Sequence, residues 1–383
     1  MQREQIELSL AATHRNPRWV GLRCLRCAEI TTELDAPQGC LACARAGFPS
    51  AMTCLYAEGT SNEHPQPYTN PLSLGEGSTP CVALCKTLWN DARQPLFAKL
   101  ESANPTGSHK DRMAANGVTH ARALGKRGVI AASSGNAGLS IAAFAAAAGL
   151  ECEIVITPSC PALYRTLILE HGANITVAAD ALARWDYVAA RIAEDNSLYA
   201  LTNYTRPAVG SPPVTIEAYK HVAHELVQSI ASMPIGDVFV PVARGDLLLG
   251  LYLGFEESLN AGRIRQLPRL IAVEPFPRLS AVASGADYRA EFVGSTTQSS
   301  TSGATVTLQS LIALQRTGGH AVVVDDAQAH SARKRLATHG WSVELCAAAA
   351  FAAYEAQPLS GAGASVIIFT AHGSRDVLSL SDL

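Results

Sequence analysis

The stretch ESANPTGSHKDRM, residues 101–113, sets proline, glycine and serine around one lysine and then runs into an amphipathic pattern. Thr106, Gly107 and Ser108 are residue types typical of a tight turn and a helix N-cap, so Lys110 falls in the first turn of a predicted helix. The positive end of the helix dipole disfavours a protonated amine there and lowers its pKa. Two interpretations are open from this window: an exposed surface lysine, or an amine that forms a Schiff base with a carbonyl.

Beyond this turn, short β-rich runs alternate with helical stretches such as 109–124, 138–148 and 331–340, which predicts parallel α/β layers. About seven such strands over nearly 300 residues predict two open, mostly parallel sheet domains with a cleft between them. The β-rich runs are GVIAAS (128–133), CEIVIT (152–157), NITVAA (174–179), DVFVPV (237–242), LIAVEP (270–275), HAVVVDD (320–326) and SVIIFTA (365–371).

Composition excludes several classes of protein. Apolar residues make up 48% of the chain and charged residues 16%, which favours a large core over disorder. The net charge of −3, with no basic stripe, argues against a nucleic-acid partner. The first ten residues carry acidic side chains where a signal would be apolar, and the most apolar run, residues 139–150, is too short to cross a bilayer. The chain is therefore predicted to be cytoplasmic, without a membrane partner.

Small polar loops follow three of the predicted strands. Residues 133–136, Ser-Ser-Gly-Asn, open a helix, and backbone N–H groups at a helix start bind anions. Residues 243–246, Ala-Arg-Gly-Asp, open a second helix, and Thr370 ends the last strand. Ordinary strand–helix turns are the alternative for each loop. In an open α/β sheet, the binding site lies off the carboxyl ends of the strands, where these loops fall.

An ordered set of motifs resembles the fold-type II pyridoxal-phosphate enzymes, the tryptophan synthase β-like group, and within it threonine synthase and its relatives. The resemblance covers roughly residues 70–383. The motifs are EGSTP (76–80), KLESANPTGSHKDR (99–112), SSGNAG (133–138), VPV with a following glycine (240–245), VE before a small-residue helix (343–350) and TAHGSRD (370–376).

The resemblance implies a role for each matching residue. Lys110 resembles the lysine that binds pyridoxal 5'-phosphate as a Schiff base and later moves protons, and Asn136 the asparagine that hydrogen-bonds the phenolic oxygen. Thr370 resembles the hydroxyl partner of the pyridine nitrogen, and a neutral hydroxyl does not force that nitrogen to be protonated. Arg244, Gly245 and Asp246 fall in the phosphate loop. The residues placed at the substrate are Thr79, Ser133, Ser134 and Gly135.

The resemblance also implies an organisation. We expect a large cofactor-binding domain over residues 61–125 and 226–383, a small α/β domain over 126–225, and an N-terminal zinc-ribbon-like segment over 1–60. Relatives of this type are commonly homodimers that close on a small amino-acid substrate, and we expect the same here.

The phosphate loop departs from the family pattern, because Ala243, Arg244 and Asp246 stand where relatives usually carry glycines. Asp246 would repel a phosphate unless it points away or caps the following helix. Arg244 either binds the phosphate or turns outward as a surface arginine. His109 stands where relatives commonly have phenylalanine, and it either packs like that ring or acts as an acid or base. These departures favour a specialised paralogue.

Four cysteines form two Cys-x2-Cys pairs separated by twelve residues, at Cys24, Cys27, Cys40 and Cys43. Four thiolates in this arrangement can close a tetrahedral zinc site, and a site with four protein ligands is structural. The alternative is two reactive or incidental cysteine pairs. Some threonine-synthase-like chains carry a similar N-terminal ribbon, which favours zinc.

The resemblance predicts a pyridoxal-phosphate lyase or synthase acting on an amino acid with a β- or γ-leaving group, as threonine synthase does when it converts O-phosphohomoserine to threonine. A β-replacement synthase that uses O-phosphoserine or O-acetylserine, cysteate- or diaminopropionate-synthase-like, is the close alternative, and a dehydratase is the third. A catalytically silent binding paralogue is the rival from another class, and the altered phosphate loop is its best support.

Overall fold

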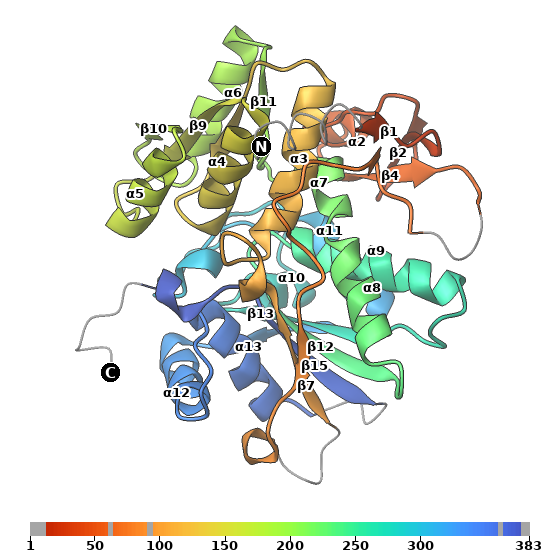
Figure 1. The fold of residues 1–383 in the computed structure, drawn as a ribbon, viewed down its shortest axis with the longest axis vertical. Helices are drawn as coiled ribbons and strands as arrows, with labels where there is room; N and C mark the ends of the chain where they lie inside the picture. Colours follow the sequence, from red (N-terminus) through yellow and green to blue (C-terminus); the bar gives the residue numbers. More distant parts are fainter. Residues whose placement is uncertain (1–12, 60–63, 90–94, 359–362, 377–383) are drawn as a thin grey trace, which may run out of the picture. The chain divides into compact units, whose positions relative to one another are not determined.

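The computed structural model describes residues 13–59, 64–89, 95–358 and 363–376. Its contacts divide the chain into two units (Figure 1). The first combines Met1–Glu76 with Lys110–Tyr219, and the second combines Gly77–His109 with Lys220–Leu383. This grouping differs from the predicted domain boundaries, because residues 110–125 share a unit with the predicted small domain.

The first unit contains a four-stranded parallel sheet with the order β10-β9-β8-β11. Every residue of the central strand β8 is buried, so helices must cover both faces of the sheet. The strands are β8 (Gly128–Ala132), β9 (Glu151–Ile156), β10 (Asn174–Val177) and β11 (Leu198–Ala200). The helices of this unit are α3 (Lys110–Ala123), α4 (Asn136–Ala148), α5 (Ala162–Glu170), α6 (Ala183–Glu194) and α7 (Pro213–Glu217).

The N-terminal module, residues 13–59 and 64–76, belongs to the same unit. Its three-stranded antiparallel sheet has the order β3-β2-β4, and β1 pairs with β5. Its core, which includes Trp19, Leu22 and Met52, also takes in Val214 of α7. The elements are β1 (His14–Arg15), β2 (Trp19–Cys24), β3 (Ile30–Thr31), α2 (Leu41–Arg45), β4 (Met52–Tyr56) and β5 (Tyr68–Thr69).

The second unit is built on a six-stranded sheet with the order β14-β13-β12-β15-β7-β6, parallel except where β6 meets β7. Phe239 and its neighbour Val240 point to opposite faces of β12 and both are buried, so this sheet too is covered on both sides. The strands are β6 (Cys81–Ala83), β7 (Leu96–Leu100), β12 (Ile235–Pro241), β13 (Arg269–Glu274), β14 (His320–Val323) and β15 (Ala364–Phe369).

Helices of the second unit pack on this sheet: α13 lies against β12 and β15, α12 packs on α13, and α11 packs on β13 and α9. The α-helices are α8 (Lys220–Ser229), α9 (Asp246–Asn260), α10 (Leu279–Ala283), α11 (Leu308–Thr317), α12 (Asp326–Ala337) and α13 (Leu345–Ala356). Short 3-10 turns are η1 (Lys86–Leu88), η2 (Glu101–Ala103), η3 (Ser299–Thr301) and η4 (Gly373–Arg375).

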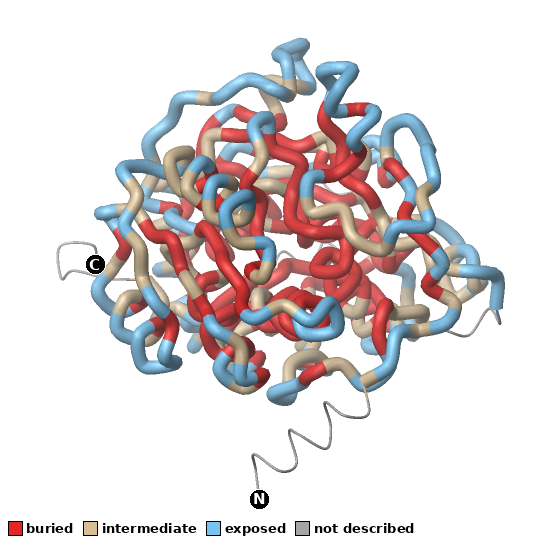
Figure 2. Tube along the Cα trace, turned by 90° about the horizontal axis from the view of Figure 1, so that it is seen from above, coloured by how far each residue is buried: buried red, intermediate tan, exposed pale blue. Residues whose placement is uncertain are grey.

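The seven strands predicted from β-rich runs are all present, as β8, β9, β10, β12, β13, β14 and β15. Buried residues follow the strands and the helix faces that pack on them, and exposed residues follow the connecting loops (Figure 2). Within the part of the chain that the structure describes, no helix is long and apolar enough to cross a bilayer.

Candidate active site

Lys110 is the first residue of α3, as the turn before it predicts. The turn depends on Gly107, which has φ +84° and whose N–H donates to the Asn104 carbonyl at 2.8 Å. A Cβ at Gly107 would also press against the guanidinium of Arg375, which donates to the Thr106 carbonyl. The turn before Lys110 is therefore fixed, and it requires glycine at position 107.

The Lys110 amine faces Tyr219 within the first unit. Its Nζ lies 3.4 Å from the Tyr219 hydroxyl and 5.7 Å from the centre of the ring. The Tyr219 side chain is fully buried, whereas Lys110 is half-buried. An ammonium next to a hydroxyl acceptor and an aromatic face is stabilised by both, so Tyr219 helps to hold this amine.

The two residues before Lys110 bond to the segment that follows β15 in the second unit. His109, the residue before it, donates its backbone N–H to the Thr370 carbonyl at 2.9 Å, and Ser108 forms a bridge with Ala371. The His109 ring is buried, with Nδ1 3.2 Å from the same carbonyl. The buried ring packs at this position, as the first of the two interpretations of His109 predicts.

The Ser133–Asn136 loop opens α4 in the first unit, where β8 ends. Asn136 is buried, and its Oδ1 accepts a 2.8 Å hydrogen bond from the Tyr164 hydroxyl. The amide nitrogen Nδ2 is the donor end of the same side chain. Ser133 Oγ accepts the N–H groups of Gly138 at 3.0 Å and Gly135 at 3.4 Å, so this hydroxyl holds the helix start.

Arg184 of α6 reaches the same loop. Its Nη1 donates to Ser134 Oγ at 3.1 Å, and Ser134 Oγ also accepts the Thr157 N–H at 2.9 Å. The other arginine near this loop, Arg165, donates to the backbone carbonyls of Cys160 and Pro158. Arg184 therefore brings a cation to the predicted anion-binding loop, whereas the Arg165 guanidinium is hydrogen-bonded to backbone carbonyls.

The predicted phosphate loop connects the end of β12 to the start of α9. Gly245 has φ +82°, and a Cβ there would collide with Ser310. The Arg244 carbonyl accepts hydrogen bonds from Thr307, Gln309 and Ser310, so α11 and the residue before it support this loop. The loop at the N-terminus of this 15-residue helix is held in one conformation.

The two charged residues of this loop are placed differently. Asp246 Oδ1 accepts a 2.6 Å hydrogen bond from Gln309 Nε2, so its carboxylate is turned toward α11. Arg244 is half-buried, and burial lowers the pKa of its guanidinium. The Asp246 carboxylate is therefore turned away, as a phosphate at this loop requires. The Arg244 side chain is only partly exposed to solvent.

Arg278, the residue before α10, supports the same loop. The residue is buried, and its guanidinium donates to the backbone carbonyls of Val242, at 2.8 Å, and Ala243, at 3.4 Å. Glu274 lies 3.6 Å from Nε. Burial lowers the pKa of Arg278 to about 10, and the Glu274 carboxylate opposes that shift. The buried Arg278 guanidinium is thus hydrogen-bonded to the backbone at the start of this loop.

Thr370 follows β15 directly and is buried. Its hydroxyl donates to Glu344 Oε1 at 2.6 Å. Thr79, predicted at the substrate, is also buried in the second unit, and its hydroxyl donates to Glu101 Oε1 at 2.7 Å. Each threonine hydroxyl therefore donates a hydrogen bond to a carboxylate.

The structure places the predicted residues in both units. Lys110, Asn136 and the loop Ser133–Gly135 belong to the first, whereas Thr79, Arg244–Asp246 and Thr370 belong to the second. Sequence reasoning missed Tyr219, Arg184 and Arg278, and named Glu344 only as part of a motif. Tyr219 lies 109 positions from Lys110, and no local pattern marks either arginine.

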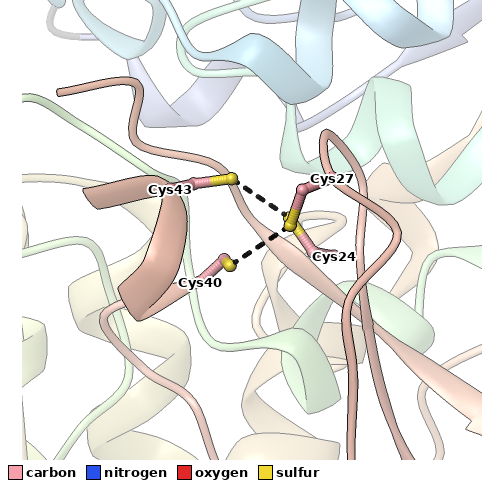
Figure 3. Close-up of side chains that lie close together, drawn as sticks. All are labelled: Cys24, Cys27, Cys40 and Cys43. Carbon is pink, nitrogen blue, oxygen red and sulfur yellow. Dashed lines mark hydrogen bonds between the residues drawn. The ribbon is translucent and has the colours of Figure 1, made fainter. Parts of the chain in front are cut away.

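The four cysteines of the N-terminal module converge, as the spacing predicts (Figure 3). Cys24 Sγ lies 3.7 Å from Cys43 Sγ, and Cys27 Sγ lies 3.8 Å from Cys40 Sγ. Burial alone would raise the pKa of Cys24, but hydrogen bonds with Ser50 and with backbone N–H groups bring that pKa to about 7. The cysteines form no disulfide.

Curated sequences with detectable similarity include threonine synthases. The Mycobacterium tuberculosis threonine synthase is 33% identical over 206 residues, which is 53% of this chain and 55% of that protein. The Methanosarcina acetivorans threonine synthase is 28% identical over 296 residues, 74% of this chain and 70% of that protein. The chain thus aligns with about half the length of the mycobacterial relatives it matches.

Solved structures share the fold. O-ureido-L-serine synthase superposes with a TM-score of 0.64 at 21% identity, covering 80% of this chain and 92% of that one. Cysteine synthase from Entamoeba histolytica superposes with a TM-score of 0.65 at 19% identity, covering 78% and 86%. The family model described as "Pyridoxal-phosphate dependent enzyme" matches residues 72–371, a span that includes Lys110, Asn136, Gly245 and Thr370. The chain therefore belongs to the family of pyridoxal-phosphate-dependent enzymes.

Proposed function

We propose that this chain is a pyridoxal-phosphate-dependent carbon–oxygen lyase of the threonine synthase type, which acts on an amino acid with a phosphorylated γ-leaving group such as O-phosphohomoserine. The observation that carries the proposal is the Lys110 amine, held by Tyr219 at the start of α3 and one residue from the segment that bonds to Thr370. The threonine synthase relatives support the substrate class.

The residues present fit the cofactor. The Arg244–Asp246 loop opens a helix N-terminus with glycine at φ +82°, and Asp246 is turned to Gln309, so backbone N–H groups can meet a phosphate. Asn136 offers an amide donor for the phenolic oxygen, and Thr370 offers a hydroxyl for the ring nitrogen. When bound, pyridoxal phosphate withdraws electrons from the substrate α-carbon.

The chain's own residues supply orientation and proton transfer. Lys110 moves a proton at the substrate α-carbon. Tyr219 holds the Lys110 amine in place for this transfer. Ser134 and Gly135 receive the substrate carboxylate at the start of α4. We assign Thr79 to the same substrate, through the hydroxyl that is bonded to Glu101.

An absorption spectrum of the purified protein tests the proposal. The spectrum is recorded before and after addition of O-phosphohomoserine, O-phosphoserine, O-acetylserine, serine and threonine. A visible band that shifts with O-phosphohomoserine, with release of phosphate and threonine, supports the proposal. A shift with O-phosphoserine or O-acetylserine alone would favour the β-replacement synthase, and a colourless chain that cannot be reconstituted would favour the silent paralogue.

Replacement of Tyr219 by phenylalanine should slow turnover about 10-fold, because the ammonium loses one hydrogen-bond acceptor and keeps the aromatic face. In cofactor-free protein, acetic anhydride should acylate Lys110 faster at neutral pH, which peptide mass spectrometry measures. Tyr187→Phe is the matched control, since that hydroxyl bonds to Glu153. Equal rates in both variants would show that Tyr219 does not hold the amine.

Replacement of Arg184 by glutamine should raise the KM for O-phosphohomoserine and for O-acetylserine about 10-fold each, because Arg184 brings a cation to the loop assigned to the carboxylate that both substrates carry. Steady-state kinetics with the two substrates measures both KM values. Arg165→Gln is the control, since its guanidinium bonds to backbone carbonyls. A rise for the phosphorylated substrate alone would assign Arg184 to the leaving group instead of the carboxylate.

We further propose that Cys24, Cys27, Cys40 and Cys43 bind one structural zinc ion in a ribbon-like module. A tetrahedral site with zinc–sulfur bonds of about 2.3 Å separates its sulfurs by about 3.8 Å. The 3.7 Å and 3.8 Å pairs match that edge and are far longer than a disulfide bond of about 2.05 Å. With four protein ligands, the site leaves no position for a substrate.

The oligomeric state and the cellular location of the chain are also proposed. We propose a homodimer in the cytoplasm, on the resemblance to dimeric relatives and on the ten cysteines, none of which forms a disulfide, which suits a reducing compartment. Light scattering of the purified chain tests the first statement, and fractionation of the source cells tests the second.

A further inference from the structure

The N-terminal module contacts α7, the short helix that ends two residues before Tyr219. The Tyr56 hydroxyl of β4 donates to Glu217 Oε2 at 3.0 Å, and Gln66 Nε2 donates to the Glu217 backbone carbonyl at 3.4 Å. Glu217 is the last residue of α7 and is only 2% exposed. The module therefore bonds to both the side chain and the backbone at the end of this helix.

Gln66 also bonds to α3, the helix that begins at Lys110. Its Oε1 accepts a hydrogen bond from Asn116 Nδ2 at 3.2 Å, and the same Nδ2 donates to the Val214 carbonyl of α7 at 3.3 Å. Because backbone carbonyls can only accept, both amide groups are held in one orientation. The Gln66 amide thus accepts a bond from one helix and donates a bond to the other, so it links α3 to α7.

The two helices are closely packed where this link is made. A Cβ added at Gly117 of α3 would lie 2.9 Å from Cγ2 of Thr215, a fully buried residue of α7. The Tyr219 N–H donates to the Ile216 carbonyl at 3.0 Å, so Tyr219 continues directly from the end of α7. A shift of α7 along α3 would therefore move the Tyr219 hydroxyl relative to the Lys110 amine.

The backbone at Gln66 is itself bonded to the rest of the module. Asn16 Nδ2 donates to the Gln66 carbonyl at 2.9 Å, and the Asn16 N–H donates to the Pro67 carbonyl at 2.9 Å. The Asn16 carbonyl in turn accepts the N–H of Trp19 at 3.0 Å, and Trp19 belongs to the hydrophobic core of the module. The Gln66 side chain therefore reaches α3 and α7 from a fixed backbone.

We propose that Gln66 and Tyr56 of the N-terminal module are positioning residues that hold Tyr219 against the Lys110 amine. The 3.4 Å between Lys110 Nζ and the Tyr219 hydroxyl is at the long end of hydrogen-bond distances, so a small shift of α7 decides whether the bond is made. The inference rests on the proposed function for the reaction of this amine. It deepens that function by adding residues that precede position 72, where the family match begins.

The test measures acylation of Lys110 by acetic anhydride in the full cofactor-free chain at neutral pH, with peptide mass spectrometry. Gln66→Met removes both amide bonds and keeps the length of the side chain. It should speed acylation about threefold, because the Tyr219 hydroxyl then holds the amine less well. In a Tyr219→Phe background the same substitution should have no further effect, because the hydroxyl that Gln66 positions is already absent.

Tyr199→Phe is the matched control, because it removes the 2.6 Å hydrogen bond from Tyr199 to Asp35, which joins the module to β11 instead of α7. This control should acylate at the wild-type rate. Circular dichroism confirms that each variant is folded. If Gln66→Met does not fold, Tyr56→Phe takes its place, with an expected increase of about twofold.

An unchanged acylation rate in the folded variant overturns the inference and leaves the proposed function standing. An equal increase with and without the Tyr219 hydroxyl overturns it as well, because the module would then act on Lys110 by a route other than Tyr219. A wild-type chain that binds no pyridoxal phosphate overturns the proposed function, and the acylation rates still decide the inference.

Discussion

Lys110→Ala is expected to abolish turnover and to remove the visible absorbance of bound pyridoxal phosphate. In the proposed function the Lys110 amine is the covalent anchor of the cofactor and the group that moves the α-proton, so both roles are lost together. A general acid–base group alone contributes about 10²- to 10⁴-fold, so the loss should be at least of that order. Absorption spectra and steady-state kinetics on the same preparation measure the two effects.

Lys126→Ala provides the control for this substitution. Lys126 lies just beyond α3 and donates to the Asn196 carbonyl at 2.5 Å, at the exposed surface of the same unit. That variant should keep both colour and activity. A Lys110→Ala protein with an unchanged visible spectrum would remove Lys110 from the cofactor and, with it, the basis of the proposed function.

If the four cysteines bind zinc as proposed, loss of the metal is expected to unfold the N-terminal module. Cys24, Cys40 and Cys43 belong to the hydrophobic core of that module, so four unligated thiols would leave a weakened centre. Structural zinc binds zinc-finger peptides with roughly 10–16 kcal/mol, and part of that energy is folding energy. Chelation or Cys43→Ser should lower the melting temperature by about 10 °C or more.

Cys54→Ser is the matched variant, because Cys54 lies on β4 of the same module and outside the quartet. It should keep one zinc ion per chain by elemental analysis and melt close to the wild type. If the purified chain contains no metal, and Cys43→Ser melts together with Cys54→Ser, the cysteines are incidental and the zinc proposal fails.

The sequence predicts the α/β frame well because its signal is local. Buried parallel strands appear as short runs of β-branched residues, and all seven such runs form strands. The strands β7 and β11 were not predicted: β7, LFAKL, carries a lysine, and β11 has only three residues. Lys99 of β7 is buried because it pairs with Glu225, which no pattern within the strand indicates.

The site is predicted less completely, because its supporting contacts join distant parts of the chain. Motifs identify Lys110, Asn136 and Thr370, but the residues that hold them come from elsewhere. Tyr164 bonds to Asn136 from 28 positions away, and Glu344 bonds to Thr370 from 26. Such pairs have no fixed spacing along a helix or strand, so they become visible only when the chain is folded.

The N-terminal module lies almost wholly before residue 72, where the family match begins. It nevertheless contacts the helix that starts at Lys110: Tyr68 pairs with His120 at 2.7 Å, and the Leu72 N–H donates to Thr119 at 3.0 Å. The module thus supports α3, the helix that begins with the proposed cofactor lysine. Family members that lack it need other side chains at these α3 positions, so this stretch of α3 should differ between the two kinds of enzyme even where the chemistry is the same.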